Sequence, residues 1–271
     1  EMCGRDWSSD VCSSDLTTLT TLIPPLHLRQ QLQLQNIWFG YQRGEGLTLK
    51  GINLSINCRN TVGFVGSTGS GKSTTVNLIL GLLRPRKGQI FVDGKPLYGE
   101  RLRAWQISLA YVPQRIFLAD TSVSNNIAFG VPPEKIDYSR VQEAAKLAQL
   151  DDFIGGLPAK YETVLGEHGV RLSGGQQQRV GIARALYREA STIIFDEATS
   201  SLDAETEMEV MTAIEGLRNT VTIILIAHRL STIQTCDRIF EFKDGRIVAA
   251  GTYNELLKSS ESFQKLAQAR R

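Results

Sequence analysis

The chain has 271 residues, of which 42% are hydrophobic and 21% are charged, and its formal net charge is +2. These proportions are those of an ordinary globular protein and exclude a disordered or fibrous chain. They give no sign of the clustered Lys and Arg of a nucleic-acid-binding protein, so no nucleic-acid partner is expected. No secretory signal is recognisable, and no apolar run approaches the ~20 residues of a membrane-spanning helix. The four cysteines lack the pair spacing of metal sites, which favours isolated thiols in a reducing compartment.

The first sixteen residues do not resemble the rest of the chain. They read EMCGRDWSSDVCSSDL, with Ser-Ser-Asp twice, and residues 11–16 look like the translation of a sequencing-library adapter. We therefore expect residues 1–16 to be non-native and the coding sequence to begin near Thr17. Residues 17–31, which contain Pro24-Pro25, are predicted to be a linker that enters a single domain of residues 32–271.

Alternating or β-rich apolar runs predict the strands of the first half of the domain. The run at residues 61–65 leads into a Gly-rich turn, and the apolar helix after it is predicted to end near Leu83. Asp93-Gly94 predicts a tight hairpin turn. The strands predicted here are residues 32–39, 54–56, 61–65, 89–92 and 107–112.

In the second half, helical spacing of apolar residues predicts helices between about Ser122 and Arg188. Strand signals then return and enclose one more predicted helix, at residues 204–217, and the tail at 253–269 is predicted to be helical. Strands that alternate with helices predict a largely parallel α/β core with an all-helical insert. The strands predicted here are residues 192–195, 221–226, and a hairpin of 239–242 with 247–249.

Residues 66–73 fit the phosphate-binding pattern G-x-x-x-x-G-K-[ST], between a predicted strand and a predicted helix. Glycines let backbone N–H groups curl around phosphates, and the helix N-terminus adds partial positive charge. We expect Lys72 to reach the β- and γ-phosphates of a nucleotide and the Ser73 hydroxyl to bind Mg²⁺. The nucleotide-binding residues predicted here are Gly66, Ser67, Thr68, Gly69, Ser70, Gly71, Lys72, Ser73 and Thr74.

Two acids follow the apolar strand at residues 192–195. They lie at the carboxyl end of a buried strand, where α/β sheets bind ligands. We expect Asp196 to hold Mg²⁺ through water and Glu197 to orient and deprotonate the attacking water. A strand that ends in two acids is often no more than a strand end, so this interpretation depends on the phosphate loop.

A second helix start suited to anions follows Leu172. Ser173 can cap the helix, and the two glycines after it expose backbone N–H groups. The alternative is a capped helix start without a ligand. The nucleotide contacts predicted here are Ser173, Gly174, Gly175 and Gln176.

At these three motifs the sequence resembles the ATPase domains of ABC transporters, over essentially all of residues 32–271. The resemblance implies a P-loop NTPase core, an antiparallel β-subdomain and an inserted all-helical subdomain at approximately residues 115–188. It implies ATP and Mg²⁺ as cofactors. Departures from the family pattern are small: Gln177 and His168 stand where basic residues are common, and Ser201 where Ala is more usual.

Four further residues take roles from the resemblance alone. Tyr41 would stack on adenine, although an aromatic of this kind can also belong to a core or edge strand. Gln114 would touch Mg²⁺ and sense the membrane domain, or else be a solvated loop residue. Asp203 would belong to the D-loop, and His228 would contact the γ-phosphate unless it is a structural strand-end histidine.

The resemblance also implies two copies arranged head to tail, so that residues 173–176 of one cover ATP bound at residues 66–73 of the other. The γ-phosphate needs positive potential on both sides, and one copy supplies one helix start there. Since every catalytic element is present, a homodimer is expected.

Three functions fit this sequence. In the first, the chain is the ATPase of an exporter, at the cytoplasmic face of the cell membrane, and an attached transmembrane domain lies outside it. The linker and residues 164–167 and 114–130 favour this, with lipid or oligosaccharide substrates. In the second, it is a separate ATPase subunit of an importer. In the third, it is a soluble ABC ATPase of DNA repair or translation, which the short segment between Gln114 and Ser173 and the single ATPase domain oppose.

Overall fold

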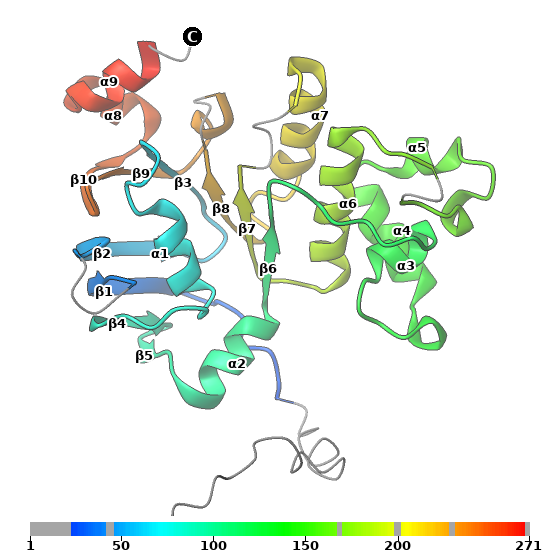
Figure 1. The fold of residues 1–271 in the computed structure, drawn as a ribbon, viewed down its shortest axis with the longest axis horizontal. Coiled ribbons are helices and arrows are strands. Elements are labelled where there is room, and N and C mark those ends of the chain that lie inside the picture. The colour runs from blue at the N-terminus through cyan, green and yellow to red at the C-terminus, as the bar shows by residue number, and fades with distance from the viewer. Residues whose placement is uncertain (1–22, 42–45, 167–169, 198–201, 228–230, 269–271) are drawn as a thin grey trace, which may run out of the picture.

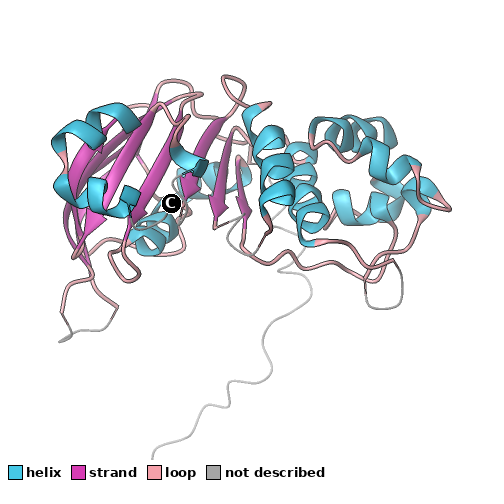
Figure 2. Ribbon diagram, turned by 90° about the horizontal axis from the view of Figure 1, so that it is seen from above, coloured by secondary structure: helices cyan, strands magenta, loops and turns pink. Residues whose placement is uncertain are grey.

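A computed structural model describes residues 23–41, 46–166, 170–197, 202–227 and 231–268, and Figure 1 shows its fold. The predicted non-native residues 1–16 lie outside this range. Two sheets and a group of helices make up the described part. The strands gather at one end and α3 to α6 at the other (Figure 2). No helix among the described residues combines the length and apolarity that a bilayer crossing demands.

The first sheet is antiparallel and four-stranded, in the order β2-β1-β4-β5. A bulge at Asn36, with φ 49°, shifts the register of β1. It thereby moves the buried face from Leu32 and Leu34 to Ile37 and Phe39. The Asp93-Gly94 turn has positive φ at both residues, which confirms the predicted hairpin. The strands are β1 (Gln31–Phe39), β2 (Leu49–Asn57), β4 (Lys87–Val92) and β5 (Lys95–Pro96).

The second sheet has six strands in the order β10-β9-β3-β8-β7-β6. All neighbours are parallel except the β9–β10 hairpin. The predicted parallel α/β core is therefore confirmed. The strands are β3 (Thr61–Gly66), β6 (Leu109–Val112), β7 (Thr192–Asp196), β8 (Thr222–Ile226), β9 (Arg238–Lys243) and β10 (Arg246–Gly251).

Two local predictions near the first helices were wrong. α1 (Lys72–Ile79) ends before Leu83 because Gly81, with φ 70°, closes it, and Leu82 N–H donates back to the Asn77 carbonyl. α2 (Gly99–Ile107) was not predicted, and it takes Ile107 from the expected strand. Its only buried residue is Trp105, so it has no apolar stripe that a sequence pattern could reveal.

The predicted helical insert is present. Of its short helices, α3 and α4 pack on the long α6, and α7 packs on α6 as well. The helices are α3 (Val123–Ile127), α4 (Tyr138–Leu147), α5 (Asp151–Gly155), α6 (Gly174–Tyr187) and α7 (Ala204–Glu215), with 3₁₀ turns η1 (Pro133–Lys135), η2 (Lys160–Glu162) and η3 (Ser231–Ile233).

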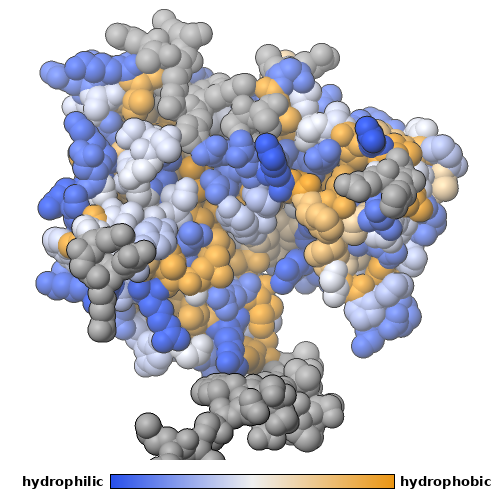
Figure 3. Space-filling model, in the orientation of Figure 1, coloured by the Kyte–Doolittle hydropathy of each residue, from blue (hydrophilic) through white to orange (hydrophobic). Residues whose placement is uncertain are grey.

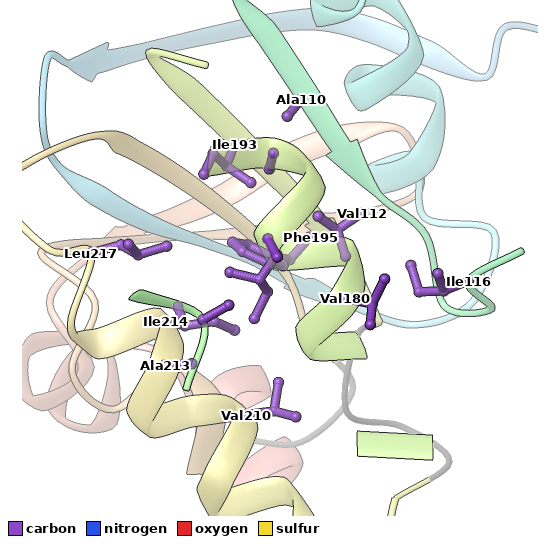
Figure 4. Packing of buried hydrophobic residues seen from close by; sticks show 14 of the residues in the cluster. Ala110, Val112, Ile116, Val180, Ile193, Phe195, Val210, Ala213, Ile214 and Leu217 are labelled. Atoms are coloured by element: carbon purple, nitrogen blue, oxygen red, sulfur yellow. The ribbon is translucent and has the colours of Figure 1, made fainter. Parts of the chain in front are cut away.

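Each face of the six-stranded sheet belongs to a different core. Alternate residues of β7 show this, since Ile193 and Phe195 pack in the core of α6 and α7, and Ile194 packs in the core of α1, α2 and the antiparallel sheet. Figure 4 shows Val180 of α6 beside Phe195 and Val112 of the sheet. The phosphate loop and the two acids lie at the carboxyl ends of β3 and β7, in a sheet that is covered on both faces.

The tail is helical, as predicted, but it consists of two helices, α8 (Tyr253–Ser259) and α9 (Glu261–Gln268). Ser260 between them has an extended backbone. Its hydroxyl donates to the buried Glu241 carboxylate of β9 at 2.7 Å. This bond ties the tail to the central sheet.

Candidate functional site

The loop between β3 and α1 has the backbone that a phosphate cradle requires. Gly66 and Gly71 have φ 142° and 107°, where other residues are strained. A Cβ at Gly66 would lie 2.1 Å from the Phe242 carbonyl oxygen, so only glycine fits there. Gly71 is the N-cap of α1, and no side chain caps this helix. The N–H groups of its first turn are therefore available to an anion.

Lys72 lies within this loop and is 5% exposed. Its Nζ donates to the Gly66 carbonyl at 3.0 Å and to the Ser67 carbonyl at 2.9 Å. These bonds hold the ammonium group under the curled backbone. The positive charge thus lies where the loop would receive phosphates.

A cavity of about 260 Å³ opens beside the loop. Tyr41, which is 60% exposed, forms one wall, and its hydroxyl is 3.1 Å from the Thr74 hydroxyl. Its ring meets Phe39 edge-to-face. Tyr41 is therefore an exposed aromatic at the site and not a core residue. The lining residues are Tyr41, Thr48, Thr68, Gly69, Gly71, Lys72, Ser73, Thr74 and Glu197. Thr48 had no motif by which the sequence could reveal it.

The two acids end β7 as predicted. The Tyr111 hydroxyl donates to Asp196 Oδ2 at 2.6 Å. Burial and this hydrogen bond raise the pKa of Tyr111, so the phenol keeps its proton. Glu197 lines the cavity and has φ 54°, a conformation uncommon outside glycine. Its N–H donates to the Ile226 carbonyl of β8 at 3.1 Å, which holds this strained backbone in place.

The donor set suits Mg²⁺. Ser73, Asp196 and Gln114 offer only oxygen ligands, which this hard cation prefers. The described residues contain no group of three or more His, Cys, Asp or Glu that could hold a metal without further ligands.

The helix start at α6 is built differently from that of α1. Ser173 Oγ accepts from Gln176 N–H at 3.2 Å, and Gln176 Oε1 accepts from Ser173 N–H at 2.9 Å, a capping box. A Cβ at Gly174 would lie 2.7 Å from Leu202, and one at Gly175 would lie 2.0 Å from the Thr206 methyl. The two glycines therefore let α6 pack closely on α7 and on the segment before it.

The structure separates the predicted residues into two groups. Residues 68, 69 and 71–74 of the phosphate loop share one cavity with Tyr41 and Glu197, whereas residues 173–176, Gln114, Asp196 and Asp203 are not in its lining. Asp203 caps α7 by accepting from Thr206 N–H at 3.0 Å. His228, His168 and Ser201 lie outside the described residues.

Gln178 of α6 is a residue that the sequence analysis missed. It is buried, and its Nε2 donates to the Gln114 carbonyl at 2.6 Å and to the Pro113 carbonyl at 3.3 Å. The helix that begins at Ser173 thus holds the backbone of the Gln114 loop. No pattern in the sequence links two residues so far apart in the chain.

Comparisons with known proteins agree with this geometry. The family model described as ABC transporter matches residues 49–200. An ATP-dependent lipid A-core flippase of Saccharophagus degradans is 44% identical over 236 residues, which are 87% of this chain and 40% of that protein. ATP-binding cassette sub-family B member 5 of Mus musculus is 41% identical over 246 residues, 90% of this chain and 19% of that protein.

Among solved structures, a bacterial Atm1-family ABC exporter with ATP bound matches with a TM-score of 0.81 and 34% identity. The match covers 91% of this chain and 43% of that one. The chain thus spans less than half of the length of these relatives. Because the family model matches more than half of the chain and an exporter structure aligns with nearly all of it, the chain belongs to the ABC transporter family as an exporter-type nucleotide-binding domain.

Proposed function

We propose that this domain binds and hydrolyses ATP to power an ABC exporter. The observation that carries this proposal is one cavity in which an uncapped helix start, Lys72, Tyr41 and Glu197 meet. The helix start and Lys72 suit a triphosphate, the exposed Tyr41 ring suits adenine, and Glu197 suits an attacking water.

Each residue has a defined task in this proposal. Free N–H groups of the phosphate loop and of the first turn of α1, together with the Lys72 ammonium, bind the β- and γ-phosphates. Ser73, Asp196 and Gln114 would hold Mg²⁺, which supplies positive charge against the phosphates. Glu197 accepts a proton from the water that attacks the γ-phosphate. His228 is proposed to contact that phosphate.

The second group of site residues supports a two-copy arrangement. Residues 173–176 are not in the lining of the cavity around Lys72. The N–H groups of Gly174 and Gly175 belong to the first turn of α6, which has no acceptors within the helix. We propose that this turn, with Asp203 beside it, closes over ATP held by a second copy. ATP would then join the copies, and hydrolysis would release them.

A second hollow, the groove beside the edge strand β6, supports a transmembrane partner. It has a volume of about 520 Å³ and lies between the sheet edge and α6, with Leu82, Ile116 and Phe129 among its apolar lining residues. Figure 3 shows apolar surface around this recess. Among the described residues that line the groove, none is an acid and three are arginines: Arg115, Arg184 and Arg188.

Arg184 gives this groove a fixed positive charge. It donates to the Asn126 carbonyl at 2.6 Å and to the Phe117 carbonyl at 2.7 Å, and it stacks on Phe129. Burial lowers its pKa to about 10, so it stays charged at neutral pH.

An apolar segment with an acidic side chain would fit this groove, and we propose that it comes from the transmembrane part of the exporter. The domain would then lie at the cytoplasmic face of the membrane. The relative from Saccharophagus degradans is named a lipid A-core flippase, which favours a lipid as the substrate.

The exchange of Glu197 for Gln tests the proposal. Glu197→Gln keeps the shape of the side chain but removes the base, so ATP binding should persist, turnover should stop, and a dimer should accumulate with Mg²⁺ and ATP. Hydrolysis is measured by phosphate release and dimer formation by light scattering. Glu134→Gln, at an exposed residue of η1, is the matched control. Turnover by Glu197→Gln at the wild-type rate would rule out the assignment of the base.

A further inference from the structure

Tyr111 lies on an edge strand of the parallel sheet, within reach of the carboxylate of Asp196, the proposed Mg²⁺ ligand. It is on β6, the edge strand, and its backbone partner on the parallel neighbour β7 is Ile194. Asp196 lies two residues further along β7, so its side chain is on the same face as that of Ile194. A tyrosine is long enough to span this diagonal.

The contact is a short hydrogen bond to a charged acceptor. The Tyr111 hydroxyl and Asp196 Oδ2 are 2.6 Å apart, within the range of O–H···O⁻ bonds. Such bonds are roughly twice as strong as those between neutral groups. The bond fixes the χ angles of Asp196 and occupies one of its two carboxylate oxygens.

The ring of Tyr111 has a separate structural task. It is 42% exposed and lines the groove between the sheet edge and α6, together with Pro113 and Ile116. Removal of the hydroxyl alone would leave this wall in place. The two tasks of the side chain can therefore be separated by a change of one atom.

We propose that Tyr111 is a positioning residue for the metal site of this ATPase. Its hydroxyl holds Oδ2 of Asp196, which would leave Oδ1 available to the water shell of a bound Mg²⁺. The proposal rests on the proposed ATPase function. It adds a residue to the site that the phosphate-loop and strand-end motifs do not contain.

Tyr111→Phe tests this by separating metal-dependent from metal-independent binding. A fluorescent ATP analogue is titrated at a series of Mg²⁺ concentrations and also in EDTA. Without the hydroxyl, the Mg²⁺ concentration for half-maximal tight binding should rise about threefold to tenfold, because part of the energy of a hydrogen bond to a charged group is lost from the metal site. Binding in EDTA should not change, since the phosphate loop is intact. Tyr138→Phe, at an exposed tyrosine on α4, is the matched control.

A double-mutant cycle shows whether the hydroxyl acts through Asp196. In Asp196→Ala, which leaves the hydroxyl no acceptor and should raise the Mg²⁺ requirement by itself, adding Tyr111→Phe should cause no further change. An unchanged or lower Mg²⁺ requirement in Tyr111→Phe, or independent effects in the cycle, would overturn the proposal. If the wild-type chain fails to bind the analogue with Mg²⁺, the proposed function itself is wrong, which is a different result.

Discussion

The close packing of α6 on α7 makes Gly175 a sharp test of the structure. A Cβ at Gly175 would lie 2.0 Å from the Thr206 methyl carbon, far inside van der Waals contact. Thr206 cannot easily move, because its N–H and hydroxyl both donate to Asp203, at 3.0 and 2.9 Å. Gly175→Ala must therefore separate the two helices or strain this cap.

The expected loss follows from two opposing effects. Overpacking costs about 1–3 kcal/mol, and a contact this short belongs at the upper end. Replacing a helical glycine with alanine returns about 0.5–1 kcal/mol. The net expectation is a loss of about 2–2.5 kcal/mol in the free energy of unfolding. With m of about 2 kcal/mol/M, the urea midpoint should fall by about 1 M.

Urea unfolding followed by circular dichroism measures this midpoint. Gly155→Ala is the control, because a Cβ there meets nothing within 4 Å in α5, and it should stabilise the chain by about 0.4–1 kcal/mol. Thr206→Ser removes the obstructing methyl group but keeps the hydroxyl. The Gly175→Ala, Thr206→Ser double variant should therefore recover most of the loss. If Gly175→Ala matches Gly155→Ala, or if Thr206→Ser gives no recovery, the packing argument is wrong.

Two further predictions concern buried side chains. Burial raises the pKa of the Cys236 thiol to about 12, while the unfolded thiol ionises near pH 9. The folded chain keeps this proton longer, so stability from this group is present below pH 9 and is lost at about 1.4 kcal/mol per pH unit up to about 12. Cys236→Ala should flatten that slope in urea unfolding, and an equal slope would contradict the assignment. Trp105 is fully buried and donates from Nε1 to the Ile79 carbonyl at 2.8 Å. Trp105→Phe should lower the free energy of unfolding by about 2–4 kcal/mol in the same assay, and a loss below 1 kcal/mol would show that this contact matters little.

Local signals explain which elements could be predicted from the sequence. Apolar alternation and β-rich runs predicted most strands of both sheets, but β2 begins at Leu49, five residues before the expected Leu54. Asp93-Gly94 predicted a hairpin because both residues tolerate positive φ. α2 was missed because it buries only Trp105. The end of α1 was placed too late, although Gly81 carried the stop signal.

The amino-acid sequence by itself determined the phosphate loop, because the spacing of Gly66, Gly71 and Lys72 acts within one turn of backbone. It also determined the two acids at the end of β7. Only the tertiary structure decided which distant residues meet them. Tyr111 reaches Asp196, Gln178 holds the Gln114 backbone, and Gly175 meets Thr206, through contacts that depend on strand register and helix packing. Such contacts join residues about 30 to 85 positions apart, and no local pattern of residue types encodes them.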